Sequence, residues 1–243
     1  MEIPQLHLDI LPPEQREVWN DLGQLPPHFV LYGGTAVALR LGHRQSVDFD
    51  FFTHQKVDPL TFPKALHFLR EAVIIQTADN TISFSLTRPG WSQPVKFSFF
   101  GGLSMGRVSD PDQASNGVQI ASLLDLAGHK LKVLFARAEK KDLLDLDAIF
   151  QNGVSVNDAA GSMVRITGGV YDPVLAIKGL TYFGDGDLNE LSTDVKTRLT
   201  AAANRFSEPS DISLKSKELA SDHPYSFLES RRKPAGFGPG RGH

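Results

Sequence analysis

The 243-residue chain contains no cysteine, which excludes both disulfide bonds and thiolate metal sites. No apolar run approaches the roughly 18 residues that a membrane-spanning helix needs. The N-terminus, Met1-Glu2-Ile3-Pro4, has neither the basic nor the apolar stretch of a secretion signal. These absences predict a cytoplasmic protein that does not enter a membrane.

An excess of positive charge is also missing, because 25 Lys and Arg residues face 28 Asp and Glu residues, for a net charge of −3. This balance argues against a broad basic surface for tight nucleic-acid binding. It still allows a local basic patch around residues 130–141. The eight histidines do not pair at metal-ligand spacing, and the Gly-x4-Gly-Lys-Ser/Thr pattern of P-loop enzymes is absent.

A short apolar run, Phe29–Tyr32, leads directly into two glycines and a threonine. The run predicts a buried strand, and the residues after it predict a helix from Thr35 to Leu41. Glycines let the backbone approach a ligand closely, and the N-terminus of a helix favours a phosphate. Gly33, Gly34 and Thr35 are therefore predicted to bind phosphate, the last with its hydroxyl as a donor.

The strand predicted over residues 47–52 alternates between apolar and acidic side chains. Val47, Phe49 and Phe51 fall on one face and Asp48 and Asp50 on the other. Residues two apart on a strand lie roughly 6.5–7 Å apart, so both carboxylates can reach one Mg²⁺ or Mn²⁺ ion. A lone Asp-x-Asp is usually solvated surface, but carboxylates on so apolar a strand need partners or a metal. We therefore predict that both acids are catalytic metal ligands.

A second group of charged residues lies on two predicted helices, over residues 122–137 and 140–151. Ser122 and Asp125 form a capping-box variant at the start of the first helix. Lys130 and Arg137 lie nearly on one face of that helix, where both could reach a triphosphate. The alternative is a solvated basic face, which is the common situation of charged helix positions.

The second of these helices carries Lys141, Asp142 and Asp145 within one turn. One interpretation is an i,i+4 ion pair between Lys141 and Asp145, worth only a few tenths of a kcal/mol. The other directs an acid into a cleft, to bind a nucleotide or to accept a proton from the nucleophile. We prefer Asp145 as the catalytic carboxylate and assign Lys141 and Asp142 to nucleotide binding, although the sequence does not separate the roles of the two aspartates.

Three runs in this order, Gly33–Phe52, Asp125–Arg137 and Lys140–Leu146, resemble the AbiEii/AbiGii-type nucleotidyltransferase toxins. That family belongs to the DNA-polymerase-β-like nucleotidyltransferase superfamily, and the resemblance extends from about Leu6 to Phe206. It implies Mg²⁺-dependent transfer of a nucleoside monophosphate from an NTP to an acceptor. In characterised relatives the acceptor is RNA, notably the 3′ end of tRNA, and a cognate antitoxin protein is a partner. The resemblance also favours a catalytic role for Lys130.

One position departs from the superfamily, whose members often carry a third carboxylate on a neighbouring strand. The matching strand is predicted over Val95–Phe100, and it places Lys96, Ser98 and Phe100 on one face. Ser98 cannot replace a carboxylate as a general base, so the identity of that base stays open. This departure supports an alternative function: a catalytically weak or inactive nucleotide-binding module that acts through a protein or RNA partner.

The whole pattern predicts an α+β fold in which a mixed β-sheet lobe, residues 1–105, is followed by a helical lobe, residues 106–206. Residues 207–243 are predicted to form a flexible tail, because apolar residues thin out and the end is rich in Gly, Pro and basic residues. A cleft between the lobes is the expected place of the site. Further elements are predicted as helices over 11–22, 60–71, 172–183 and 193–206, and as strands over 73–76 and 81–86.

Overall fold

The computed structural model describes residues 5–221, and within them the strands form one seven-stranded sheet of order β3-β4-β5-β2-β1-β7-β6. Strand β2 lies at the centre, antiparallel to β1 and parallel to β5. The strands are β1 (Val30–Tyr32), β2 (Asp48–Phe52), β3 (Val73–Ala78), β4 (Thr81–Leu86), β5 (Val95–Phe100), β6 (Asp112–Gln113) and β7 (Gln119–Ile120).

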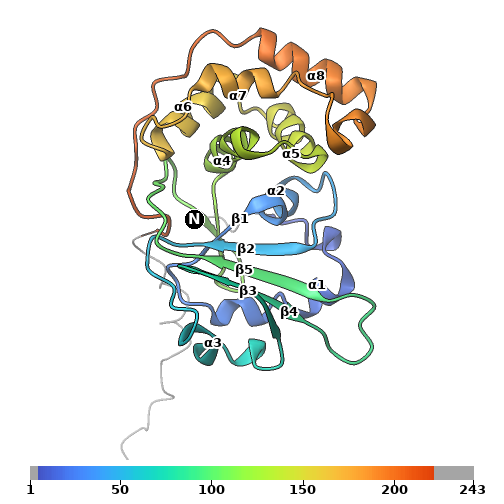
Figure 1. The fold of residues 1–243 in the computed structure, drawn as a ribbon, viewed down its shortest axis with the longest axis vertical. Helices are drawn as coiled ribbons and strands as arrows, with labels where there is room; N and C mark the ends of the chain where they lie inside the picture. Colours follow the sequence, from blue (N-terminus) through green and yellow to red (C-terminus); the bar gives the residue numbers. More distant parts are fainter. Residues whose placement is uncertain (1–4, 222–243) are drawn as a thin grey trace, which may run out of the picture.

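Helices cover both faces of this sheet (Figure 1). On one face lie α1 (Pro13–Val18) and α3 (Phe62–Ala65), and on the other lie α2 (Gly33–Leu41), α4 (Leu123–Ala136) and α5 (Lys140–Gln151). An outer layer consists of α6 (Val156–Ile166), α7 (Pro173–Gly179) and α8 (Thr193–Asn204). The predicted α+β fold with a mixed sheet is confirmed. In the described part of the chain, no helix has the length and apolar character needed to cross a bilayer.

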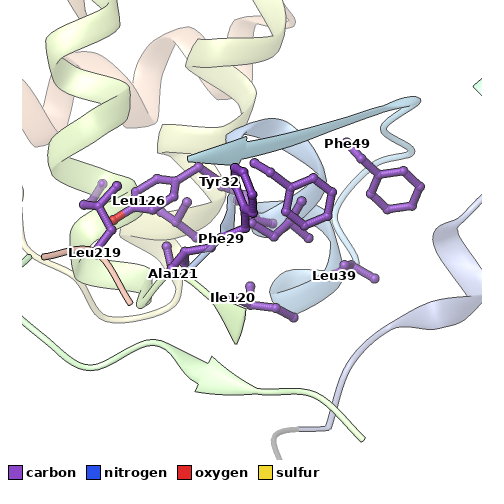
Figure 2. Packing of buried hydrophobic residues seen from close by; sticks show 14 of the residues in the cluster. Phe29, Tyr32, Leu39, Phe49, Ile120, Ala121, Leu126 and Leu219 are labelled. Carbon is purple, nitrogen blue, oxygen red and sulfur yellow. The ribbon is translucent and has the colours of Figure 1, made fainter. Parts of the chain in front are cut away.

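The two faces of β2 have different neighbours, as its alternating sequence predicts. Phe49 and Phe51 are fully buried on the α1 side, where they stack on Phe97 and Phe99 of β5 at ring distances of 5.6 and 5.4 Å. The large aromatic area removed from water on this face stabilises the centre of the sheet. Figure 2 shows part of this core. The opposite face of β2 is thereby left for the acidic residues.

Several helix boundaries predicted from the sequence differ from those in the structure. The helix predicted over 11–22 ends at Val18, and the range 60–71 holds only α3 and the short 3-10 helix His67–Leu69. Leu66 is extended between these two elements and is itself buried, so tertiary packing overrides the helical tendency of the segment. Helix α6 was missed, although Ser155 caps it through the N–H of Asp158 at 3.0 Å.

The sheet continues beyond residue 105. Strands β6 and β7 lie within the range that the sequence assigns to the helical lobe, and β7 pairs in parallel with β1. Helices begin only at Leu123, the start of α4. Each of these strands has two residues, joined by a turn that contains Gly117 at φ +95°, so neither is long enough to show a periodic pattern.

Residues 207–221, which we call the strap, run from the end of α8 back to the sheet (Figure 1). On α6, Asp158 accepts a hydrogen bond of 2.6 Å from the hydroxyl of Ser210. Near the sheet, the buried guanidinium of Arg107 donates to the backbone carbonyls of Glu218 at 2.6 Å and of Ala220. The strap therefore contacts both lobes, contrary to the flexible tail predicted from residue 207. The rest of that predicted tail, residues 222–243, lies outside the described residues.

We predict that Arg107→Ala lowers the free energy of unfolding by roughly 2–4 kcal/mol, because it leaves buried carbonyl groups without their donor. Urea denaturation measures this loss, and trypsin should cleave faster at Lys215 and Lys217 in the variant. The matched control is Arg165→Ala, which removes a 2.7 Å ion pair to Asp211, a side chain that is 93% exposed. The control should cost less than about 1 kcal/mol. Equal losses in the two variants would show that the strap is not held by Arg107.

Candidate active site

A cavity of about 350 Å³ lies between the sheet and the helices α4 and α5. Its walls come from the start of α2, the loop between α2 and β2, the end of β5, and the facing sides of α4 and α5. Most of the predicted site residues line it: Gly33, Gly34, Asp48, Asp50, Lys130, Arg137, Lys141 and Asp142. Two predicted residues, Thr35 and Asp145, lie behind the wall instead.

Asp48 and Asp50 both face the cavity from β2. Within residues 5–221, neither carboxylate receives a hydrogen bond or forms an ion pair. Burial, together with the charge of Asp48, raises the pKa of Asp50 to about 6. Across the parallel register, Asp50 pairs with Ser98, whose hydroxyl lies 3.1 Å from that of Ser83. As predicted, the neighbouring strand offers no third acid here.

These two carboxylates fit a hard divalent cation. Their oxygen atoms are the ligand type that Mg²⁺ and Mn²⁺ prefer, and they have no competing partner in the described part of the chain. The raised pKa of Asp50 reflects a charge that a bound cation would stabilise. Residues 5–221 contain no group of three or more His, Cys, Asp or Glu side chains arranged to hold a metal. An ion on this pair would therefore complete its shell with water or phosphate oxygens.

The two glycines permit close approaches from opposite sides. Gly33 has a φ of +72°, and a Cβ atom there would lie 2.5 Å from a carboxylate oxygen of Asp50. A Cβ atom on Gly34 would meet the guanidinium of Arg44 and, at 3.1 Å, the hydroxyl of Ser46. Helix α2 begins at Gly33, so the first N–H groups of α2, which have no partner within the helix, belong to this wall.

Thr35 does not face the cavity, although the sequence predicted a phosphate-binding hydroxyl there. The side chain is completely buried, and its hydroxyl donates to the backbone carbonyl of Asp48. The same oxygen lies 2.9 Å from the Ser46 hydroxyl. Thr35 therefore fixes the start of β2 relative to α2, and Ser46 is the hydroxyl that lines the cavity.

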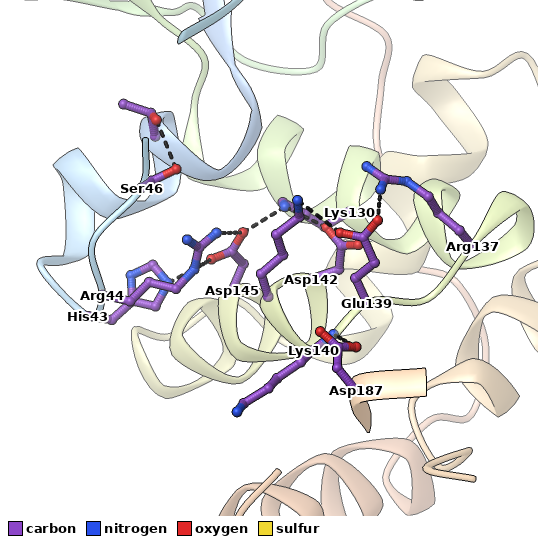
Figure 3. Close-up of polar contacts among 12 residues, drawn as sticks. His43, Arg44, Ser46, Lys130, Arg137, Glu139, Lys140, Asp142, Asp145 and Asp187 are labelled. Carbon is purple, nitrogen blue, oxygen red and sulfur yellow. Dashed lines mark hydrogen bonds and ion pairs between the residues drawn. The ribbon is translucent and has the colours of Figure 1, made fainter. Parts of the chain in front are cut away.

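Asp145 is the centre of a buried polar network (Figure 3). Its oxygens accept hydrogen bonds from His43 Nε2 at 2.8 Å and from Arg44 Nε and Nη2 at 2.7 and 2.9 Å, and one lies 2.6 Å from Lys130 Nζ. Burial alone would raise the pKa of Asp145, but the His43 hydrogen bond and the two cations lower it to about 2. A fully partnered carboxylate of this kind is a structural anchor, which opposes its predicted role as a base.

Lys130 also donates to Asp142, with 2.8 Å between Nζ and Oδ1. The Lys130 side chain is almost completely buried, and its ammonium pairs with both Asp142 and Asp145 of α5 (Figure 3), so it is not a free phosphate ligand. Of these acids only Asp142 lines the cavity, and its Oδ2 atom is buried without a hydrogen-bond partner. The structure thus separates two acids that the sequence could not.

Two cations lie at the mouth of the cavity. Arg137 follows the last residue of α4, and Lys141 is in the first turn of α5. Both form ion pairs with the single carboxylate of Glu139, Lys141 at 2.9 Å, which leaves one positive charge in excess. The alternative ion pair between Lys141 and Asp145 is not formed, because Lys141 pairs with Glu139 and Asp145 with Lys130. Both side chains are about half exposed, so they can reach a ligand at the entrance.

The uncharged part of the cavity was missed by the sequence analysis. Phe52, Phe100, His129 and Val133 form this part of the wall. The alternation that placed Asp48 and Asp50 on the cavity face continues to Phe52, and a signal was therefore present. His129 contacts the rings of Tyr32 and Phe52.

Comparisons with known proteins identify the family and the fold of the chain. A family model described as nucleotidyl transferase AbiEii toxin of a type IV toxin-antitoxin system matches residues 18–212. An uncharacterized protein of Aquifex aeolicus is 30% identical over 178 residues, which is 71% of this chain and 82% of the relative. Two Helicobacter pylori structures, a candidate nucleotidyltransferase and JHP933, share the fold with a TM-score of 0.51 and 21% identity. They match 78% of this chain and 90% and 87% of their own.

We predict that Asp145→Asn destabilises the protein by roughly 2–4 kcal/mol at pH 7, because it leaves buried cations without their charge partner. The folded-state pKa of Asp145, about 2, is below the ordinary value of 3.8. The stabilisation is therefore fully present above about pH 4 and is lost as the pH falls towards 2. Urea denaturation should show that the difference in the free energy of unfolding between wild type and variant decreases as the pH is lowered from 4 to 2.

The matched control is Asp147→Asn on the same helix, where the partner Arg198 is 43% exposed. This change should cost about 1 kcal/mol, since solvent screens the remaining cation. Two results would contradict the anchoring role. One is a loss of unfolding free energy for Asp145→Asn that stays constant down to pH 2, and the other is a loss no larger than that of the control.

Proposed function

Because the chain belongs to the AbiEii family of nucleotidyltransferase toxins of type IV toxin-antitoxin systems, we propose that it transfers a nucleoside monophosphate from an NTP to an RNA acceptor with the help of Mg²⁺. One observation carries the proposal: two carboxylates without partners among residues 5–221 face the same cavity as the first residues of a helix. Membership of this family identifies the protein as a nucleotidyltransferase toxin. The use of a metal ion, an NTP donor and an RNA acceptor is our proposal.

The triphosphate is proposed to bind at the α2 end of the cavity. The N–H groups of Gly33 and Gly34 supply donors for phosphate oxygens, and Ser46 lines the same wall. Arg137 and Lys141 at the mouth add positive charge, and their exposed side chains can move onto the ligand. Thr35 contributes by holding the wall in place through its bond to Asp48.

Asp48 and Asp50 are the residues that would hold Mg²⁺, or Mn²⁺ in its place. When bound, such an ion supplies charge neutralisation to a phosphoryl group that is being displaced. The protein itself contributes a rigid β2 strand, which presents both carboxylates on one face without reorganisation. Preorganised charge of this kind is the main contribution expected from an enzyme of this class.

Asp142 is our candidate for the group that orients or deprotonates the acceptor hydroxyl. It lines the cavity, whereas Asp145 is fully used by His43, Arg44 and Lys130. Lys130 fixes one oxygen of Asp142 and leaves the other without a partner. Lys130 therefore acts here by positioning Asp142 and by adding positive charge behind the phosphate site.

RNA with a tRNA-like 3′ end is the proposed acceptor, supported by the family and by the cationic mouth of the cavity. The proposal includes a cytoplasmic location, where NTPs and RNA are available, and a cognate antitoxin as a partner. A protein hydroxyl is the second acceptor to be tested.

Ser98 beside Asp50 favours an alternative function, a nucleotide-binding module with little or no turnover. In that case the same cavity would bind NTP and Mg²⁺, and the biological effect would come from contact with a protein or RNA partner. Nucleotide binding measured by calorimetry, without labelling of any acceptor, would support this alternative over catalysis.

We predict that the wild-type protein labels total RNA when it is incubated with α-³²P-labelled NTPs and Mg²⁺. Asp48→Asn should reduce the labelling rate on the order of 100-fold or more, because it removes one of two charges that hold the ion. The control is Asp79→Asn, an exposed acid in the β3–β4 hairpin, which should label like wild type. Equal labelling by Asp48→Asn and wild type would overturn the assignment.

A further inference from the structure

The cavity face of the central strands changes character along its length. The parallel register between β2 and β5 pairs Asp48 with Lys96, Asp50 with Ser98, and Phe52 with Phe100. Successive pairs on one face are separated by roughly 6.5–7 Å. The surface therefore proceeds from an acid–lysine pair through an acid–serine pair to an aromatic pair in two steps, and its aromatic end lies one step beyond Asp50.

Three rings form this end, and we call Phe52, Phe100 and His129 the aromatic wall. All three line the cavity. Phe100 and His129 contact Phe52 edge to face, with ring centroids 5.2 and 5.1 Å away. Tyr32 stacks on Phe52 at 4.9 Å with an interplanar angle of 10°. These contacts fix the orientation of the wall before any ligand binds.

His129 has a hydrogen-bonding group that the protein does not use. The residue is only 9% exposed, and in the described part of the chain its buried Nδ1 atom has no hydrogen-bond partner. Burial, together with the nearby charges of Lys132 and Lys130, lowers the pKa of His129 to about 3. The imidazole is therefore neutral at physiological pH and offers one donor and one acceptor. Buried polar groups are normally paired, so an unpaired one beside a cavity points to a ligand.

We propose that the aromatic wall is the nucleobase subsite for the donor NTP. The planar base packs against Phe52 and Phe100, and the imidazole of His129 hydrogen-bonds to the polar edge of the base. The inference rests on the proposed function and deepens it, because it makes His129 a residue that determines nucleotide specificity. The one-step separation between Asp50 and Phe52 suits a ligand whose phosphates and planar base are joined by a single sugar.

The consequence for selectivity follows from the chemistry of the wall. Stacking on an aromatic ring is tolerant of the identity of the base, since every base has a π-face. A buried hydrogen-bonding group is selective, because a base with the wrong edge leaves that group unpaired. Phe52 and Phe100 should therefore set the affinity for all four NTPs, and His129 should set the differences among them.

The test is calorimetric titration of the full-length chain with Mg²⁺ and without RNA, using the four NTPs and inorganic triphosphate. Phe100→Leu should weaken NTP binding about tenfold and leave triphosphate binding unchanged, since only the base loses a contact. Phe100→Tyr keeps the ring and should bind like wild type, which separates lost stacking from a folding defect. His129→Phe should reduce the ratio between the tightest and weakest NTP about tenfold.

The matched control is Phe135→Leu, a half-buried aromatic on α4 that contacts Tyr171 and does not line the cavity. It should leave NTP binding unchanged. If wild type binds neither NTP nor triphosphate, the proposed function fails. If wild type binds NTPs and Phe100→Leu weakens the binding of NTP and of triphosphate equally, the nucleobase subsite is overturned. It is also overturned if Phe100→Leu weakens the binding of neither. Unchanged NTP binding with weaker binding of single-stranded RNA would also overturn it, by placing the acceptor at the wall.

Discussion

The buried carboxylate of Asp145 joins three walls of the cavity. It lies on α5 and holds Arg44 from the loop before β2 and Lys130 from α4. A fully buried charge is tolerated only when its partners are equally fixed, so each of these groups depends on the others. Arg44 is thereby held against Gly34, and Lys130 against Asp142. This one carboxylate and its donors thereby link α5, α4 and the loop before β2 around the cavity (Figure 3).

The same site contains acids in two opposite situations. Asp145 has three charged or polar donors and a lowered pKa, whereas Asp50 has none and a raised one. The paired charge of Asp145 stabilises the fold. The unpaired charge of Asp50 is buried at a cost in free energy, which a bound ligand can reduce. Asp142 lies between these extremes, because Lys130 satisfies only one of its oxygens. Charges that are paired within the protein therefore build the cavity, and those left unpaired are available to a substrate.

The sequence was sufficient to predict those parts of the site that depend on residues close together along the chain. The period-two alternation of residues 47–52 predicted which side of the strand carries the acids, and the Gly-Gly pair predicted the turn from β1 into α2, which lines the cavity. It was insufficient where a residue is defined by distant contacts. Nothing local to Thr35 indicates that its hydroxyl donates a hydrogen bond to the backbone carbonyl of Asp48, and nothing local to Asp145 reveals the donors more than 100 positions away. Strands of two residues and the strap lack any periodic signal, because pairing partners elsewhere in the chain create them.

The strap also imposes an order on assembly. Because the ribosome releases a chain from its N-terminus, both acids of β2 and all of α5 emerge well before Glu218 and Ala220, whose carbonyls Arg107 needs. The carbonyl partners of Arg107 are thus synthesised after the strands and helices that line the cavity, so the strap closes on elements whose chain is already made.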